Sequence, residues 1–442
     1  MKINLLLICL ITCYSYSQEI LSLEKAIEYG IMNSNDIAIV KNDASIIKNN
    51  NHIGNAGLLP NIAITSGYNT SITSDKSELN DSIPDGFSSF ISEDILNSAN
   101  SKTINMSASI GLTYRLFSGF RGMYTLSKFK QQNIIADENI RYQVELKIIE
   151  IVNQYYDLLN KKNIHDIFKK SYDISLDRYN QAQSQYELGS LSTKDMLNIE
   201  VLLNEDKIRL DESFINMNSS KLNLALTIGK SEKSFSINQE FNFNNNMNIE
   251  DLLSKMNTNN SSILIADLNY QIAQNEIKLA KSSFLPTVNL VSSYGYNNIN
   301  FGSGLYDSQQ DFGFRGGVNI EIPLFSSNMR RKNLQNAKIN LDSRSHALDE
   351  MKSTIKTSLL NAYYSYQDGL SSLQLMEKNL DTAEKNYNIN KELYEVGQLS
   401  NLEYREAQLQ LEQIRINYSV KLSTTKMQEY IIYQLSGQLK RN

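Results

Sequence analysis

The chain has 442 residues, of which 43 are Lys or Arg and 48 are Asp or Glu, so its formal net charge is −5. This balance excludes the basic field that nucleic-acid binding needs, and a mean hydropathy of −0.37 is too polar for a helical membrane protein. Only four prolines occur, whereas average usage would give roughly 20. The chain can therefore form very long stretches without a helix breaker.

The amino terminus has the pattern of a secretory signal peptide. A basic residue precedes an apolar core at residues 3–11, and small residues follow at the two positions that a signal peptidase reads. We expect a signal peptide over residues 1–17, cleaved before Gln18. The alternatives are a buried amino-terminal helix and lipidation at Cys13, which follows a threonine that fits a lipidation motif poorly. Both cysteines precede the expected cleavage point, so no disulfide is predicted in the exported chain.

The chain contains an internal duplication. A Leu-Pro dipeptide ends at Pro60 and again at Pro286, and a Leu-Phe-Ser tripeptide begins at Leu116 and again at Leu324. The segment between the Leu-Pro and Leu-Phe-Ser motifs is longer in the first repeat than in the second. We interpret the extra residues, in a polar stretch around residues 71–101, as a loop insertion. The predicted organisation is a first repeat, a linker, a second repeat and a tail, over 18–229, 230–248, 249–437 and 438–442.

The stretch between Gly122 and Gly189 contains neither Pro nor Gly and predicts a very long helix over about 119–188, and a helix over about 329–396 repeats that length in the second half. Each would be roughly 100 Å long at 1.5 Å per residue. Because such a helix cannot bury its apolar stripe inside a compact domain, we expect it to pack against other helices as in a coiled coil. The stripe of the first long helix comprises Val144, Ile148, Ile151, Val152, Tyr155, Leu158 and Leu159.

Shorter helices complete the predicted helical part, at about 23–56, 192–227, 249–283 and 400–435. Gly189 and Gly397 are the expected left-handed terminators of the long helices. Ser192 and Ser400 can cap the helices that follow. One long helix beside two short ones stacked end to end would match their lengths.

Four segments alternate between apolar and polar residues, as strands do, at about 60–73, 104–118, 286–298 and 311–325. Each has the length that a tilted strand needs to cross an outer membrane, with one apolar and one polar face. Four strands cannot close a barrel, and lipid does not tolerate an open sheet edge. We therefore expect sister subunits to complete a shared barrel.

This repeated order of elements, with its Leu-Pro, Leu-Phe-Ser and glycine-tip motifs, resembles the TolC family of outer-membrane efflux proteins over essentially the whole mature chain. The resemblance implies a mainly α-helical fold with transmembrane β-strands. Long antiparallel helical hairpins would form an α-barrel tunnel, and four strands per chain would enter a twelve-stranded outer-membrane β-barrel. It further implies a homotrimer in the outer membrane that extends into the periplasm. There it would export passively with a periplasmic adaptor (membrane fusion protein) and an inner-membrane pump.

The resemblance also assigns roles at the two tips. Residues that would contact the adaptor are Tyr186, Gly189, Leu191, Ser192, Tyr394, Gly397, Leu399 and Ser400. Acidic residues at the family's periplasmic entrance correspond to Asp195, Glu403 and Glu406, and threefold repetition would turn them into rings that favour cations. The alternative is that Glu403 and Glu406 are ordinary solvated helix residues.

The second tip departs from the family pattern at one position. An Arg that helps to latch the closed tip in the best-known member is replaced here by Leu399. A hydrogen bond between Tyr394 and Asp195 could remain, but we expect a tip held more by packing and less by salt-sensitive contacts. Single-channel recordings of Asp195→Ala should then show little change in conductance, and a large rise in open probability would contradict this expectation.

No catalytic constellation is evident in the sequence. The three histidines stand alone without metal-ligand spacing, and no Gly-x-Ser-x-Gly elbow occurs. We interpret Gly302-x-Gly304 as loop flexibility, and the tyrosine pairs at 155–156 and 363–364 as helix packing in preference to a ligand stack. We therefore predict no enzyme activity, no cofactor, no metal and no nucleic-acid partner. The alternatives to an export duct are a periplasmic or surface coiled-coil scaffold with a β end-domain and, more remotely, an outer-membrane hydrolase.

Overall fold

The computed structural model describes residues 19–76, 97–231, 235–237, 241–302 and 306–439. The predicted signal peptide and most of the loop insertion lie outside these ranges. The chain divides into two compact units, and each draws on both sequence repeats. The helical unit comprises Met1–Ala44, Ala136–Asp267 and Ala347–Asn442, and the strand unit comprises Ser45–Ile135 and Leu268–His346.

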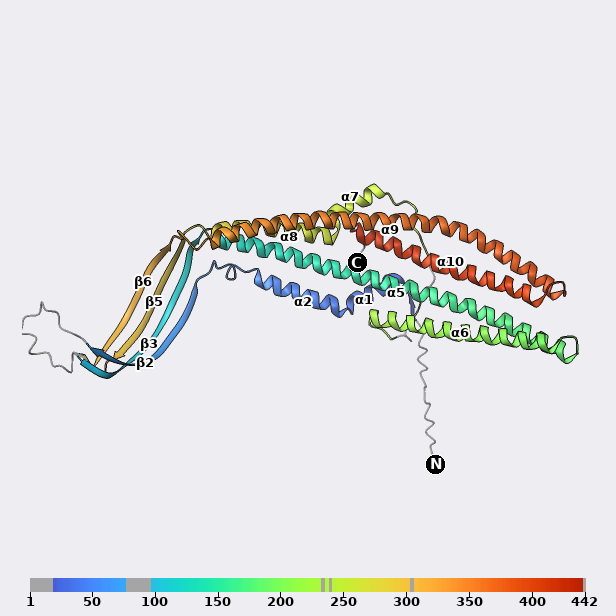
Figure 1. Ribbon diagram of the computed structural model, residues 1–442, viewed down its shortest axis with the longest axis horizontal. Helices are drawn as coiled ribbons and strands as arrows, with labels where there is room; N and C mark the ends of the chain where they lie inside the picture. Colours follow the sequence, from blue (N-terminus) through green and yellow to red (C-terminus); the bar gives the residue numbers. More distant parts are fainter. Residues whose placement is uncertain (1–18, 77–96, 232–234, 238–240, 303–305, 440–442) are drawn as a thin grey trace, which may run out of the picture. The chain divides into compact units, whose positions relative to one another are not determined.

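One antiparallel sheet forms the strand unit together with the adjoining helix ends (Figure 1). Its strands, in spatial order, are β2 (Asn61–Lys76), β3 (Asn97–Ser118), β5 (Thr287–Asn300) and β6 (Ser308–Glu321). β2 and β3 continue into the stretch that we interpreted as an insertion, because they pair with each other as far as Lys76 and Asn97. The sheet leaves β2 and β6 as its two edges.

Large apolar side chains cover one face of this sheet and remain exposed. Ile64 of β2 is 80% exposed, and Phe314 and Ile320 of β6 are 72% and 65% exposed. These side chains alternate along each strand with polar ones such as Arg315 and Asn319. An apolar face of this extent is typical of a surface that contacts lipid or another protein.

Helices α5 (Arg121–Glu187) and α9 (Met329–Glu395) each run for 67 residues without interruption. The absence of proline from both segments permits this length. The shorter helices are α1 (Leu23–Met32), α2 (Asn35–Asn50), α6 (Thr193–Ile228), α7 (Ile249–Asn259), α8 (Ser261–Ser282) and α10 (Asn401–Leu435). Among the residues with a described structure, no helix is both long enough and apolar enough to cross a lipid bilayer.

Where the sequence predicts one short helix before each strand pair, the structure has two helices with a break between them. The breaks fall at Asn33 and Asn260, whose side-chain amides donate to the backbone carbonyls of Ile228 and Leu435, each at 2.9 Å. These carbonyls lie in the last turns of α6 and α10. At each break, the asparagine side chain therefore provides a donor for a backbone carbonyl in the last turn of another short helix, which has no partner within its own helix. Such a contact is what end-to-end stacking of two short helices requires.

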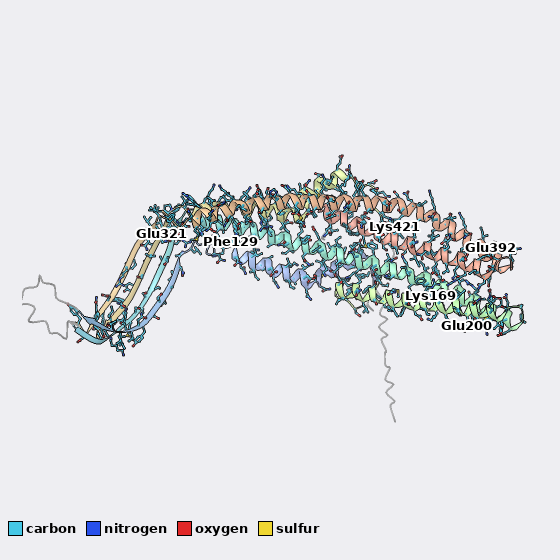
Figure 2. The ribbon with its side chains drawn as sticks, viewed as in Figure 1. Phe129, Lys169, Glu200, Glu321, Glu392 and Lys421 are labelled. Atoms are coloured by element: carbon cyan, nitrogen blue, oxygen red, sulfur yellow. The ribbon has the colours of Figure 1, made fainter. Side chains whose placement is uncertain are left out.

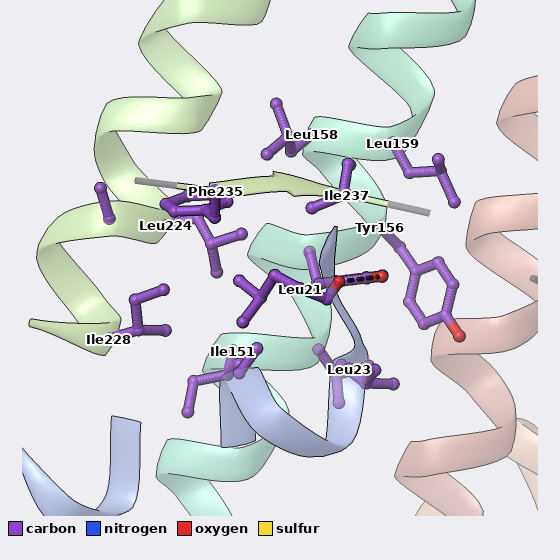
Figure 3. Packing of buried hydrophobic residues seen from close by; sticks show 14 of the residues in the cluster. Leu21, Leu23, Ile151, Tyr156, Leu158, Leu159, Leu224, Ile228, Phe235 and Ile237 are labelled. Carbon is purple, nitrogen blue, oxygen red and sulfur yellow. Dashed lines mark hydrogen bonds between the residues drawn. The ribbon is translucent and has the colours of Figure 1, made fainter. Parts of the chain in front are cut away.

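The predicted stripe of α5 is buried in the main hydrophobic core of the helical unit, where Ile148, Ile151 and Val152 are fully buried (Figure 3). Two three-residue strands, β1 (Glu19–Leu21) and β4 (Phe235–Ile237), pair in parallel at this core. These strands could not be predicted from the sequence, because three residues are too few to show alternation.

A glycine allows α9 and α10 to pack closely within the helical unit. A Cβ on Gly369 would lie 2.5 Å from Thr425 Oγ1. Gly369→Ala is therefore expected to lower the free energy of unfolding by about 1–3 kcal/mol, measured by urea denaturation followed by circular dichroism. Adding Thr425→Ala should recover part of this loss, and a double variant as unstable as the sum of the two single ones would contradict the proposed contact.

Candidate functional site

The α5–α6 and α9–α10 hairpins end in two tips at the same end of the helical unit (Figure 1). Gly189 and Gly397 have φ angles of 75° and 76°, which confirms the predicted left-handed terminators. In the first tip the Ser190 N–H donates to the Gln185 carbonyl at 2.9 Å, and the second tip has the equivalent bond. A Cβ on either glycine would meet no described atom within 4 Å, so the space around both turns is open.

The predicted docking residues divide between the surface and the interior of the tips. Tyr186 is 43% exposed, and the neighbouring Leu188 is 84% exposed. Ser192 and Ser400 are exposed, whereas Leu191 packs against the small core beneath the first tip, and Leu399 is half-buried. The tip surface therefore combines a few exposed apolar side chains with polar ones, and half-buried leucines lie beneath it.

The three predicted acidic residues lie exposed near the starts of α6 and α10, where two of them help to cap the helix. The Asp195 N–H donates to Ser192 Oγ at 3.2 Å, and the Ser192 hydroxyl donates to the Asp195 carboxylate at 2.7 Å. Ser400 and Glu403 form a reciprocal capping box. Hydrogen bonds from the Ser400 side chain and backbone N–H lower the pKa of Glu403. Glu406 lies one turn further along α10.

Three tyrosines join α9 to α10 behind the second tip. Tyr394 stacks on Tyr404 with ring centroids 4.8 Å apart, and the hydroxyls of Tyr387 and Tyr404 lie 2.9 Å apart. The Arg178 guanidinium of α5 lies 4.9 Å from the centroid of the Tyr404 ring, on the opposite hairpin. Burial and the hydrogen bond with Tyr387 raise the pKa of Tyr404. Tyr394 thus contributes to packing within the chain, while Asp195 is bonded to Ser192.

A buried ionic cluster, which the sequence analysis missed, joins the two hairpins. Arg405 of α10 donates two hydrogen bonds to the Asp206 carboxylate of α6, both at 2.7 Å. Asp206 is 1% exposed and Arg405 is 3% exposed. Arg209 bridges Asp206 to Glu412, whose carboxylate lies 2.5 Å from Arg209 Nη1. We refer to Asp206, Arg209, Arg405 and Glu412 as the ionic cluster.

The environment of Asp206 favours its charged form. Burial by itself would raise the pKa, but hydrogen bonds from Arg405 and Ser175, together with the charges of Arg405 and Arg209, outweigh burial and lower the pKa of Asp206. Nearby Arg178 hydrogen-bonds to Gln408 of α10. Burial and the charge of Arg405 lower the pKa of Arg178. The two hairpins are thus joined by ion pairs and by the contact of the Arg178 guanidinium with the Tyr404 ring.

A signal for this cluster is present in the sequence. Ile199, Asp206, Ser213 and Ser220 recur every seven residues along α6, and all four are buried. A charged residue on such a seven-residue stripe requires a partner on the neighbouring helix. Because Leu399 stands in place of the latch arginine, we predicted a tip with few salt-sensitive contacts. The structure has ion pairs on the same two hairpins, but they lie in the ionic cluster and not at the tip.

In the part of the chain that the structure describes, no group of three or more His, Cys, Asp or Glu side chains is placed to hold a metal ion. The tyrosine pair at 155–156 packs in the core as predicted, and the Tyr155 hydroxyl donates to the Leu21 carbonyl at 3.0 Å. Its repeat counterpart differs, because Tyr364 is 64% exposed.

Comparison with known proteins identifies relatives of this chain. Residues 252–438 match the sequence model of a family described as outer membrane efflux protein. The outer membrane protein TolC of Salmonella enteritidis is 24% identical over 307 residues, which cover 66% of this chain and 60% of that protein. TolC of Escherichia coli strain K12 is 20% identical over 312 residues, covering 66% of this chain and 61% of the relative. The matches thus span about three-fifths of the length of these relatives.

Solved structures share the fold over nearly the whole chain. The CmeC outer membrane channel of Campylobacter jejuni aligns with a TM-score of 0.78 at 16% identity, covering 95% of this chain and 86% of that one. The MtrE outer membrane channel of Neisseria gonorrhoeae, in its open state, aligns with a TM-score of 0.72 at 14% identity, covering 95% and 90%. The chain is thus similar in sequence to outer membrane efflux proteins, and it shares the fold of solved outer-membrane channels, with the same helical hairpins and strands, over nearly its whole length.

Proposed function

We propose that this protein is one subunit of a homotrimeric outer-membrane channel that conducts substrates passively to the exterior. A periplasmic adaptor and an inner-membrane pump would deliver the substrates and the energy. The observation that carries the proposal is the four-stranded sheet with two free edges and one exposed apolar face. The family consists of transport channels, which makes an enzymatic role unnecessary to explain the fold.

The sheet geometry supports closure by further copies of the chain. All three strand pairings are antiparallel, so edge strands β2 and β6 run in opposite directions. β6 of one subunit can therefore pair antiparallel with β2 of the next, and the same pairing can repeat around a ring. Closure would satisfy the backbone groups of both edges, which lipid cannot do. The apolar face would then contact lipid and the polar face would line the lumen.

The helical unit supports the tunnel and docking parts of the proposal. A ring of subunits would gather the Asp195, Glu403 and Glu406 carboxylates around a common axis at the periplasmic entrance. The exposed side chains of Leu188 and its counterpart Val396 offer an adaptor hairpin an apolar contact at each tip. Residues 1–17 would direct export, with lipidation at Cys13 as the alternative processing.

Planar-bilayer recording of the detergent-purified protein tests the proposal. A duct should give discrete single-channel current steps, whereas a coiled-coil scaffold with a β end-domain should give none. A variant with residues 61–76 deleted removes edge strand β2, so it should lose both the current steps and the stable oligomer. Full-length protein that folds, inserts into lipid and carries no current would refute the proposed function.

A further inference from the structure

A hollow of about 500 Å³ lies in the strand unit where the strands meet the helices. Arg115, Arg121 and Arg330 line it together with a single acidic residue, Glu321. Figure 2 shows Glu321 at this junction, where β6 ends. We refer to these four residues and the space between them as the arginine hollow. It is remote in sequence from the tip residues, and the proposed function assigns it no role.

The arginine hollow opens on the polar face of the sheet. Arg115 of β3 lies between two apolar residues that point to the opposite face, and it pairs across the ladder with Asn289 of β5. Asn289 also lines the hollow, as does Thr287, which pairs with Glu321 of β6. The guanidinium of Arg115 therefore lies on the side of the sheet away from the exposed apolar face.

Two long helices begin at the same hollow. Arg121 is the first residue of α5 and Arg330 is the second residue of α9. Neither helix has an acidic residue in its first turn, whereas α6 and α10 have one each. A helix start without an acidic residue leaves its backbone N–H groups and positive dipole end without a local counter-charge. Both helix starts thus add to the positive potential of the arginines.

The charges lining the hollow do not balance. Three arginines and one glutamate line it, and none of the three arginines forms a salt bridge with another described residue. Arg115 and Arg121 are exposed and Arg330 is half-buried, so an anion that enters the hollow can reach all three. A guanidinium group presents a planar fork of N–H donors that matches the oxygens of a phosphate. The hollow therefore has the donors, the charge and the room for a phosphate group.

We propose that the arginine hollow binds the phosphate group of a solute on the polar face of the sheet. This proposal deepens the proposed function, because that face lines the lumen only if the sheet closes into a barrel. In a trimer the hollow would recur three times and form a basic collar around the lumen. The collar would select for phosphorylated or similarly anionic solutes among those that reach it.

Titration calorimetry of the detergent-purified full-length protein with inorganic phosphate tests the site without requiring a current. The wild type should bind phosphate, and Arg115→Gln/Arg121→Gln/Arg330→Gln should bind it at least about tenfold more weakly. Glu321→Gln should bind phosphate several-fold more tightly, because it removes the only opposing charge among the lining residues. The matched control is Arg315→Gln on β6, whose guanidinium lies 3.9 Å from Asp311 and outside the hollow, and it should bind as the wild type does.

The outcomes separate this site from the proposed channel. Phosphate binding in the predicted order of the variants supports the site even if none of the proteins conducts current. The lack of current would then refute the proposed channel but not the phosphate site. Absence of phosphate binding by the wild type, or equal binding by the wild type and Glu321→Gln, overturns the site. Binding of phosphatidylglycerol in nanodiscs without binding of inorganic phosphate also overturns it, because the hollow would then serve lipid and not a solute.

Discussion

Asp206→Ala is expected to lower the free energy of unfolding of the helical unit by about 3–5 kcal/mol, the usual loss when one partner of a buried ion pair is removed. The substitution leaves Arg405, which is 3% exposed, buried without its bidentate partner. It also frees Arg209 from one of its two carboxylates. Urea denaturation followed by circular dichroism measures the loss, and hydrogen exchange should place it in α6 and α10.

Asp211 of the same helix provides the matched control. It pairs with Lys207 at 2.6 Å, but both side chains are at least half exposed. Asp211→Ala should therefore change stability by less than about 1 kcal/mol. Replacing both partners, as in Asp206→Leu/Arg405→Met, should cost less than Asp206→Ala alone because Arg405 is then not left buried without its carboxylate. Equal effects of Asp206→Ala and Asp211→Ala would show that the cluster does not join the hairpins.

The same ion pair predicts how stability depends on pH. Because the folded protein holds the pKa of Asp206 below its ordinary value, the contribution of this residue is complete above the unfolded pKa of about 3.9. It is lost as the pH falls through the lowered folded pKa. The wild type should therefore lose stability more steeply than Asp206→Asn as the pH falls below about 4. Parallel pH profiles would argue against a paired carboxylate.

Glu403→Gln/Glu406→Gln is expected to reduce the preference of the channel for cations several-fold, because three subunits would lose six carboxylates from one constriction. The reversal potential in a potassium chloride gradient measures this preference. Glutamine at position 403 can still accept the Ser400 backbone N–H, as Glu403 does at 3.0 Å. The substitution therefore removes charge without removing the helix cap.

Glu350→Gln is the matched control for the entrance carboxylates, because Glu350 is also exposed but lies well along α9 from the tip. It should leave the reversal potential unchanged. Glu403→Gln alone should retain the thermal stability of the wild type, whereas Glu403→Ala should lose the cap as well as the charge. A reversal potential that stays constant in the double variant would assign both residues to the solvated helix surface.

Features that depend on local sequence were predictable in this chain. The lack of proline and the spacing of apolar residues predicted the long helices, and Gly189, Gly397, Ser192 and Ser400 predicted both tips. The helix breaks at Asn33 and Asn260 were missed, because their cause is a hydrogen bond to a helix end 195 and 175 residues away in the chain, respectively. Propensity alone does not disfavour asparagine strongly enough to end a helix.

The ionic cluster shows the same limit of local reasoning. Asp206 and Arg405 lie on different repeats, and their pairing depends on how two hairpins pack. Repetition in the sequence also does not guarantee a repeated environment. Tyr156 is 3% exposed, whereas Tyr364, its counterpart in the second repeat, is 64% exposed. The first pair packs in the main hydrophobic core and contacts β1 through Tyr155. The different environment of the second pair could not be predicted from the repeated sequence.

Native mass spectrometry of the detergent-extracted protein tests most directly whether the sheet is completed by sister subunits. The edge strands β2 and β6, together with the exposed apolar face, predict an assembly of several chains, three in the proposed function, that persists until the detergent is made denaturing. A folded single chain that stays in solution without detergent would contradict the account, because its apolar sheet face would then need no lipid and its edges no partner.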